Sequence, residues 1–350
     1  MTRDLDQTAY TYDPASGRLD GIEAPGGVDL ELSQNGPLPT EQTLAGPVAG
    51  SVSTSYDESF RPDAIKVNGD DPVTYSYDDD DLITEAGDLE ITPDPDSGMT
   101  AATSIGEIET ASAYNDYGEL ETETAEDSAG TLYSATYTRD DAGRIETKSE
   151  TTPAGTTTWE YGYDDAGRLE EVERNGSPYA SYGYDPNSNR TSATSPGGTT
   201  TATYDGQDRI ETYGDLEYEF SKNGQLESVT DTSSSDVTIY DYDALGNLDS
   251  VELPAGTDID YLTDGLGRRV GKKVDGDLVE GYLYEGASLN PVAVLDDNGD
   301  VAERFVYGTD PHVPDYMIKG SGTYRIISDQ LGSPRLLVDV STGSVAQRIE

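Results

Sequence analysis

Carboxylates are nearly the only side chains in this sequence that could do acid–base or metal-ligand chemistry. Of the 350 residues, 70 are Asp or Glu, 21 are Lys or Arg, one is His and none is Cys. The lack of Cys excludes disulfides, thiol nucleophiles and thiolate zinc sites. The one histidine, His312, excludes a His-rich metal site, and its turn-rich surroundings in Asp310–Pro314 predict a solvated imidazole.

Two acidic clusters, Asp78–Asp81 and Asp296–Asp300, have the oxygen ligands that calcium prefers. Neither has the Asp-x-Asp-x-Asp-Gly spacing with a later Glu, and Asn298-Gly299 in the second cluster is typical of a turn. Among so many carboxylates some pair will lie at a glycosidase distance, but no pair stands out. We therefore expect no metal, no cofactor and no enzymatic activity, and a carboxylate-based hydrolase is the least favoured alternative.

Two further classes of binding are disfavoured by motif and charge. The glycine-rich run Gly265–Gly271 lacks the G-x-G-x-x-G spacing and a following helix pattern, so we interpret it as a hairpin turn. The net charge of −49 argues against nucleic acids and anionic membrane surfaces. It favours adaptation to salt, with dispersed calcium sites as the alternative.

The elements that carry these residues form a repeat. Tyrosines recur at steps of 19 to 26 residues, a spacing that indicates a repeat architecture. The fullest copies read Tyr-Asp, then Gly, then Arg or Asn, then Leu and an acid. Their signature residues are Tyr12, Asp13 and Gly17; Tyr163, Asp164, Gly167 and Arg168; and Tyr242, Asp243 and Gly246. Degenerate copies are anchored on Tyr114, Tyr137 and Tyr218.

Each unit is predicted to be strand, turn, strand. Tyr and Thr favour a pleated surface, Asp after Tyr closes a turn, and Gly supplies a positive φ. Asn68-Gly69 and Asp275-Gly276 predict tight hairpins between alternating apolar residues. The spacing of Leu169 and Val172 breaks strict alternation and suggests a bulge. The predicted fold is all-β, with tandem antiparallel hairpins in a curled, one-layer sheet that has a modest apolar core.

The Tyr-Asp-x-x-Gly-[Arg/Asn]-Leu units resemble the YD repeats of the Rhs family, shared with the B and C components of insecticidal toxin complexes and with teneurins. Tyr261–Val270 and Asn290–Ala293 look like the start of the Rhs-associated core, as does Ser328–Leu336 above all. The core motif residues are Asp329, Leu331, Gly332, Ser333, Pro334 and Arg335. Gln330 departs from the His that is usual in relatives.

The resemblance implies a spiral of hairpins that forms part of a hollow β-shell around a variable C-terminal toxin. It divides the chain into a poorly matched segment (1–50), a YD-repeat array (51–235) and the start of the core (236–350). The sequence stops before the family's autoprotease motif, so no cleavage residue is carried over.

The expected function is therefore a non-enzymatic scaffold of a polymorphic toxin system. Its partners would be an effector encoded downstream or in the same longer chain and other shell segments. We expect a secreted or cell-surface location within a larger system, and the sequence contains no signal peptide or transmembrane segment. An extracellular adhesion or carbohydrate-binding repeat is the alternative.

Overall fold

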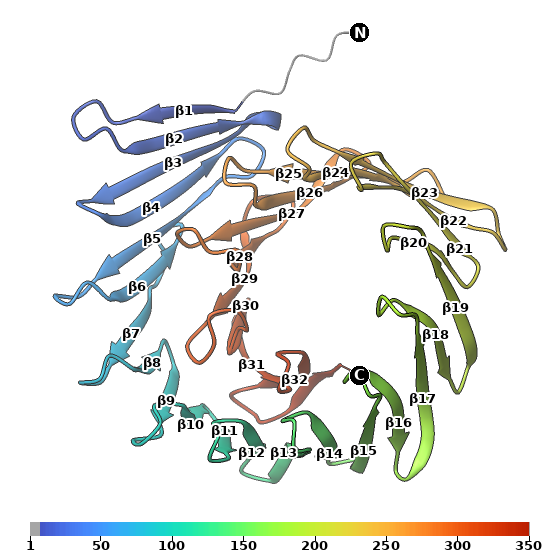
Figure 1. Ribbon diagram of the computed structural model, residues 1–350. Coiled ribbons are helices and arrows are strands. Elements are labelled where there is room, and N and C mark those ends of the chain that lie inside the picture. Colours follow the sequence, from blue (N-terminus) through green and yellow to red (C-terminus); the bar gives the residue numbers. More distant parts are fainter. Residues whose placement is uncertain (1–7, 350) are drawn as a thin grey trace. The chain divides into compact units, whose positions relative to one another are not determined.

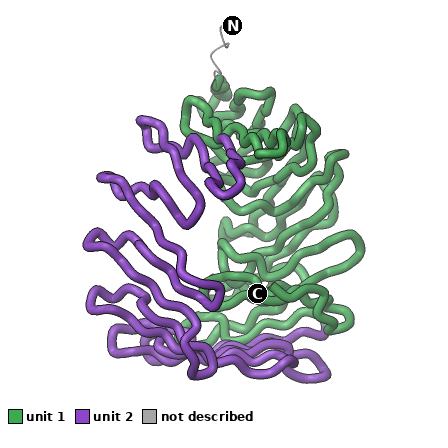
Figure 2. The backbone as a smooth tube through the Cα atoms, turned by 90° about the vertical axis from the view of Figure 1, so that its right-hand side faces the viewer, with its two compact units in different colours: residues 1–106, 240–350 green, residues 107–239 purple. Residues whose placement is uncertain are grey.

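The computed structural model describes residues 8–349, and its regular structure is almost entirely β-strand. These residues form 33 strands and one short 3-10 helix, η1 (Pro25–Gly27) (Figure 1). The predicted all-β class is confirmed. The chain divides into two compact units, one of residues 1–106 with 240–350 and one of residues 107–239 (Figure 2). The sequence segments bounded at 50 and 235 stay a prediction.

The first unit contains an N-terminal and a C-terminal run of strands. The N-terminal strands are β1 (Ala9–Tyr12), β2 (Leu19–Ala24), β3 (Val28–Asn35), β4 (Leu38–Ala45), β5 (Gly50–Tyr56), β6 (Pro62–Val67), β7 (Val73–Tyr77), β8 (Ile83–Ala86), β9 (Leu89–Pro93) and β10 (Thr100–Ile105). The C-terminal strands are β24 (Leu248–Glu252), β25 (Asp258–Thr263), β26 (Arg269–Val274), β27 (Asp277–Tyr284), β28 (Pro291–Leu295), β29 (Val301–Val306), β30 (Tyr316–Lys319), β31 (Gly322–Ser328), β32 (Pro334–Asp339) and β33 (Val345–Arg348).

The second unit is a continuous series of hairpins. Its strands are β11 (Ile108–Tyr114), β12 (Leu120–Asp127), β13 (Gly130–Arg139), β14 (Ile145–Thr152), β15 (Gly155–Tyr163), β16 (Leu169–Arg174), β17 (Ser177–Tyr184), β18 (Arg190–Ser195), β19 (Gly198–Tyr204), β20 (Ile210–Tyr213), β21 (Leu216–Phe220), β22 (Leu226–Asp231) and β23 (Asp236–Tyr242), the last of which runs past the boundary. Within each unit every strand pairs antiparallel with the next strand in the chain, as in the contact between β15 and β16.

The predicted hairpin turns are present. Asn68 and Gly69 have φ of 51° and 77°, and Asp275 and Gly276 have φ of 52° and 89°. Positive φ at both central residues is the type I′ geometry, whose twist matches that of the flanking strands.

The predicted bulge is also present. Tyr161 pairs with Val172, but two residues later Tyr163 pairs with Leu169, so β16 has one extra residue at this point. The extra residue returns Leu169 and Val172 to the same face of the sheet, which explains their three-residue spacing. The same shift separates Leu226 from Val229 in β22.

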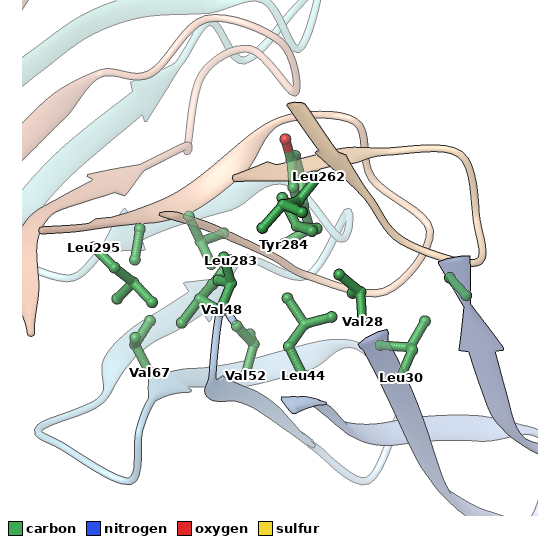
Figure 3. Packing of buried hydrophobic residues seen from close by; sticks show 14 of the residues in the cluster. Val28, Leu30, Leu44, Val48, Val52, Val67, Leu262, Leu283, Tyr284 and Leu295 are labelled. Atoms are coloured by element: carbon green, nitrogen blue, oxygen red, sulfur yellow. The ribbon is translucent and has the colours of Figure 1, made fainter. Parts of the chain in front are cut away.

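The first unit has two packed layers, so the expectation of one layer is wrong there. Its main core joins residues from β2–β6 to residues from β25–β28 (Figure 3). Val28, Val67 and Val270 are among its fully buried side chains. Alternation along one strand shows that one face is buried but does not show which strands cover that face, and this is why the second layer escaped prediction.

The second unit is much less buried. Between residues 153 and 239 only Val172 and Ala202 are buried among the described residues. Apart from these two, the side chains along β15–β23 are half-buried or exposed on both faces. This part of the chain therefore depends on hydrogen bonding and on contacts between neighbouring turns more than on an apolar core.

Candidate functional site: the repeat turns and the Glu285 cavity

The turn of each repeat is closed by its aspartate. Asp164 Oδ1 accepts hydrogen bonds from the backbone N–H groups of Ala166 and Arg168, each at 2.9 Å. Asp164 Oδ2 accepts from Arg168 Nε at 2.7 Å. The Arg168 side-chain hydrogen bond and the backbone hydrogen bonds lower the pKa of Asp164. Gly167 has a φ of +81°, as the turn chemistry predicts.

The arginine of one turn reaches the tyrosine of the next. The Arg168 guanidinium lies 4.5 Å from the centre of the Tyr184 ring. The Tyr184 hydroxyl in turn donates to the carbonyl of Leu169, the residue directly after that arginine, at 2.7 Å. Cation–π and hydrogen-bond contacts therefore tie two successive turns through one pair of side chains. We call this pair of contacts the turn relay.

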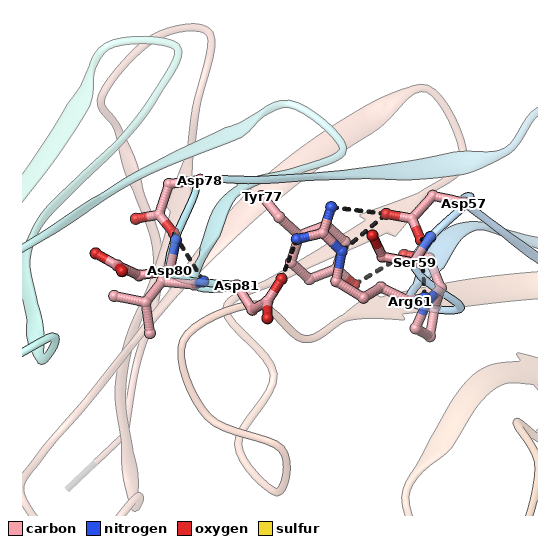
Figure 4. A network of polar contacts seen from close by, with 9 residues as sticks. Asp57, Ser59, Arg61, Tyr77, Asp78, Asp80 and Asp81 are labelled. Atoms are coloured by element: carbon pink, nitrogen blue, oxygen red, sulfur yellow. Dashed lines mark hydrogen bonds and ion pairs between the residues drawn. The ribbon is translucent and has the colours of Figure 1, made fainter.

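The turn relay recurs along both units. Its other complete copies join Arg61 to Tyr77, Arg144 to Tyr163 and Arg268 to Tyr284. Figure 4 shows the first of these, in which the Arg61 guanidinium lies 4.4 Å from the Tyr77 ring centre and binds Asp57. Arg61 also forms an ion pair with Asp81 of the next turn at 2.5 Å. Two neighbouring acidic turns thus share one cation.

In two degenerate repeats, the residue at the tyrosine position lies two residues after the tyrosine predicted to hold it. Arg139, not Tyr137, holds the tyrosine position, and its Nη1 donates to the Leu120 carbonyl at 2.8 Å. Phe220, not Tyr218, lies beneath Arg209, 5.3 Å from the guanidinium carbon to the ring centre. The predicted anchors were wrong because residues i and i+2 of a strand point to the same face, so two aromatic positions fit the same pattern.

In one copy of the turn the ion pair is buried. The Asp264 and Arg268 side chains are 0% and 3% exposed, and their ion pair measures 2.8 Å. Arg268 Nη2 donates to Gln42 Oε1 at 3.2 Å, and Gln42 Nε2 donates to the Gly286 carbonyl at 2.5 Å. Gln42 lies on β4, so this repeat turn is hydrogen-bonded to the second layer of the same unit. Nothing in the sequence around Gln42 indicated this contact.

The other two full signatures also form turns closed by their aspartate, and the Asp13 turn is one residue longer than the Asp164 and Asp243 turns. Asp13 accepts from the N–H groups of Ala15 and Ser16, and Gly17 has a φ of +70°. Asp243 accepts from the N–H groups of Leu245 and Asn247 and from Asn247 Nδ2, and Gly246 has a φ of +91°. Tyr12 is 59% exposed, and Tyr242 precedes Asp243 at the end of β23.

The core motif forms one further repeat turn. Asp329 Oδ1 accepts from the N–H groups of Leu331 and Ser333 at 3.0 and 3.1 Å, and Gly332 has a φ of +77°. Pro334 and Arg335 begin β32. The motif therefore has the geometry of the YD turns, with Ser328 in the tyrosine position opposite Pro334.

A second buried ion pair lies near the core motif. Arg325 Nη1 and Asp315 Oδ1 are 3.3 Å apart, and Arg325 Nη2 donates to Thr103 Oγ1 of β10 at 3.3 Å. Asp315 also accepts from Gly308 N, Thr309 N and Thr309 Oγ1. Burial lowers the pKa of Arg325. Sequence reasoning missed this pair because the two residues are ten positions apart and belong to no motif.

A cavity of about 390 Å³ lies within the first unit, and we call it the Glu285 cavity. Its walls include the side chains of Ile65, Tyr75, Tyr77, Glu285 and Tyr307. Glu285 follows Tyr284 and so stands where other repeats have the turn aspartate. Burial raises the pKa of Glu285, while a hydrogen bond from Thr54 Oγ1, at 3.0 Å, opposes that shift.

Comparison with known proteins identifies the repeats. The family model described as teneurin YD-shell matches residues 1–350. The chain belongs to the teneurin YD-shell family. Human teneurin-4 is 28% identical over 99% of this chain, and teneurin-3 of Danio rerio is 26% identical over 99%. Each match covers 13% of the relative, so this YD-shell chain spans only a small part of these curated proteins.

Solved structures share the YD-shell fold. A structure of the Photorhabdus luminescens Tc holotoxin pore, with a mutation in TccC3, has a TM-score of 0.65 and 12% identity. A crystal structure of TcdB2-TccC3-TEV has a TM-score of 0.64 and 12% identity. Each similarity covers 98% of this chain and 21% of the solved chain. At this identity the likeness concerns the fold.

The acidic clusters of this YD-shell chain are parts of turns. Asp78 Oδ1 accepts from the N–H groups of Asp80 and Leu82, and Asp296 Oδ1 accepts from those of Asn298 and Asp300. Over residues 8–349 no three His, Cys, Asp or Glu side chains are grouped as a metal site. His312 lies in a loop, with its Nδ1 3.2 Å from Asn290 Nδ2.

Helices contribute little to the described part of this YD-shell chain. None in that part has the length and apolar character needed to cross a membrane.

Proposed function

We propose that this chain is a non-enzymatic scaffold, part of a shell that encloses a toxin or effector. The effector would be encoded in the same longer chain or just downstream, and other shell segments would complete the enclosure. The observation that carries the proposal is the turn relay between successive hairpins, in a chain that the YD-shell family model matches from residue 1 to residue 350.

The contacts made by the charged side chains of the turns support a structural role. The aspartates of the repeat turns accept backbone N–H groups and bind the arginine or asparagine four residues later. A carboxylate held in this way is ionised and already paired, which suits a cap better than a general acid or base. The relatives and solved neighbours likewise favour a scaffold.

Location and acidity belong to the same proposal. We infer that the chain acts outside the cell or at its surface, within a larger secreted system. The net charge of −49 fits a salty medium, in which the repulsion between the carboxylates is screened.

Protease protection in the full-length gene product tests enclosure. We expect the polypeptide that follows residue 350 to survive native digestion while the repeats are intact. Changing the capping Asp140, Asp164 and Asp205 together to Ala should open the repeat array, because each Asp closes its turn. The downstream polypeptide should then become accessible to the protease.

A matched control changes Asp116, Asp141 and Asp165 to Ala. These exposed turn residues lie next to capping residues in the chain, so the charge change is the same. If the downstream polypeptide is digested at the same rate in the wild type and in the triple Asp-to-Ala variant, enclosure is contradicted. A gene and neighbourhood that encode no further polypeptide would also contradict it.

Carbohydrate binding is the second candidate function, since Tyr117 is 90% exposed at a turn and Tyr12 is 59% exposed. Exposed tyrosine rings suit stacking on sugar rings. Binding of the isolated chain to immobilised glycans, lost on changing Tyr117 to Ala, would favour this alternative.

A further inference from the structure

The Glu285 cavity combines a carboxylate with aromatic and aliphatic walls. It lies where β6–β8 of one layer face β28 and the segments that follow β27 and β29 of the other, all within the first unit. Tyr75, Tyr77 and Tyr307 contribute rings, and Ile65, Ile83 and Val292 contribute aliphatic surface. Its volume of about 390 Å³ is in the range of sites for small organic molecules.

In the part of the chain that the structure describes, no cation balances the charge of Glu285. Among the described residues its side chain has one hydrogen-bond partner, the Thr54 hydroxyl at 3.0 Å, and no Lys or Arg forms an ion pair with it. The shorter aspartates elsewhere cap their own turns, whereas the extra methylene of Glu285 carries its carboxylate to β5 of the facing layer. A half-buried carboxylate without a counter-ion is costly unless a ligand supplies one.

The tyrosines are held as walls. The Tyr77 hydroxyl donates to the Pro62 carbonyl at 2.8 Å, and the Tyr307 hydroxyl donates to the Pro291 carbonyl at 3.0 Å. Because these hydroxyls are already used, the rings offer the cavity mainly their π-systems and edges. One face of the Tyr77 ring is covered by the Arg61 guanidinium, 4.4 Å from the ring centre, so Tyr77 has only its edge and its other face to offer. Their negative faces attract cations, above all cations with methyl groups that also fit aliphatic walls.

We propose that the Glu285 cavity binds a small alkylated ammonium group, of the size and charge of choline. Glu285 supplies the counter-charge, the three tyrosine rings contact the methyl groups, and the aliphatic side chains exclude water. The cavity lining also includes Asp310 and Ser288, but Asp310 Oδ1 accepts from the N–H groups of His312 and Val313, and Ser288 Oγ accepts from Asn290 N. A hard metal ion therefore fits poorly, because calcium and magnesium take several oxygen ligands and few oxygens here are uncommitted. A sugar fits poorly for the same reason, since it needs many polar partners.

Calorimetric titration of the intact chain with choline chloride, at fixed ionic strength, tests the proposal. We expect saturable binding that weakens about tenfold or more in Glu285→Gln and in Tyr307→Leu, and that persists in Tyr307→Phe, which keeps the ring. Glu303→Gln is the matched control, because Glu303 lies on β29 but binds Lys319 outside the cavity. Circular dichroism checks that each variant is folded.

Two further ligands separate the cavity from general attraction to a chain of charge −49. The uncharged choline isostere 3,3-dimethylbutanol should bind about tenfold more weakly or not at all, and potassium should not compete at equal concentration. The proposal is overturned if choline does not bind, or if it binds equally to Glu285→Gln. Equal binding of the neutral isostere, or full competition by potassium, would also overturn it.

Discussion

At the residue scale, the position four residues after the turn aspartate is occupied in several repeats by either arginine or asparagine, and both side chains donate to the aspartate. Arg168 donates from Nε to Asp164, whereas Asn189 and Asn247 donate from Nδ2 to Asp185 and Asp243 at 3.0 and 2.7 Å. In each case the aspartate keeps its two backbone hydrogen bonds. Arg168 adds the contact with the tyrosine of the next turn, and its Nη1 also donates to the Asp185 carbonyl and to Ser188 Oγ of that turn, at 3.1 and 3.2 Å.

This difference predicts the effects of two substitutions at one position. Changing Arg168 to Ala should destabilise the protein by about 1–2 kcal/mol, because it removes a half-exposed ion pair and a cation–π contact. Changing Arg168 to Asn should recover part of that loss by restoring the bond to Asp164. Urea unfolding midpoints would measure both effects. Equal midpoints for the two variants would show that the bond to Asp164 contributes nothing measurable to stability.

Glu285 gives a prediction with the opposite pH sign from the turn aspartates. The raised pKa of Glu285 means that the folded state favours the protonated carboxyl group. The contribution of Glu285 to stability is therefore present below the pKa of the unfolded chain, and it is lost as pH rises through the pKa of the folded state. The variant Glu285→Gln should therefore be at least as stable as the wild type at pH 7, and its advantage should shrink in mild acid.

Thermal unfolding between pH 4 and pH 8 checks this prediction, with Glu303→Gln as the control. The groups around Glu285 include the Thr54 hydroxyl, the carboxylate of Asp310 and the phenols of Tyr56, Tyr75, Tyr77 and Tyr307. None of the phenols titrates in that window, since burial raises the pKa of each, for Tyr307 to about 12. A variant less stable than wild type at pH 7 would contradict the assignment.

At the element scale, the two layers of the first unit approach so closely that one turn admits no side chain. Gly87, between β8 and β9, has a φ of +60°, and a Cβ there would lie 2.1 Å from the Tyr316 hydroxyl oxygen. That hydroxyl also donates to the Ala86 carbonyl at 3.2 Å. The turn between β8 and β9 is thus fitted to a tyrosine of the facing layer.

Changing Gly87 to Ala should therefore destabilise by about 2 kcal/mol or more, since it adds steric overlap to backbone strain. Gly36 is a matched control, because its φ is also +60° but a Cβ there would meet nothing within 4 Å. Gly36→Ala should lose only about 1 kcal/mol. Calorimetric melting of the two variants would show the difference, and similar losses would mean that the layers yield easily.

The repeat was predictable from the sequence, whereas the packing between distant repeats was not. Tyr-Asp and Gly fix local turns, and the spacing of Leu169 and Val172 revealed a bulge, because both signals act within one hairpin. The contact of Gln42 with Arg268 joins residues 226 positions apart, and no local pattern encodes it. The Glu285 cavity left one faint signal, a glutamate in place of the turn aspartate.

At the scale of the whole molecule, charge opposes folding. A net charge of −49 on 350 residues repels itself in dilute buffer, and the sparsely buried hairpins between residues 153 and 239 have little apolar surface to offset that repulsion. The lowered pKa values of the turn aspartates show that local pairing stabilises their ionised form nonetheless.

Monovalent salt should therefore raise the unfolding midpoint, with KCl and NaCl acting alike. At about 1 M salt the Debye length is about 3 Å, which screens repulsion between turns but leaves buried pairs such as Asp264 with Arg268 in place. Scanning calorimetry over a salt series measures the effect. Stabilisation by micromolar calcium alone, with none from monovalent salt, would show that specific cation sites are responsible.

The turn relay has a consequence for how the gene can change in length. Removing residues 164–184 would join Tyr163 directly to Asp185 and recreate a Tyr-Asp pair, minus one hairpin. Tyr163 would keep its contacts with Arg144 and the Ile145 carbonyl, while Arg168 and Tyr184 would leave together. No relay would lose one member and keep the other. In-frame loss or duplication of a hairpin would therefore leave every remaining turn relay with both of its members. The number of repeats can change in this way while the chemistry of each turn stays the same.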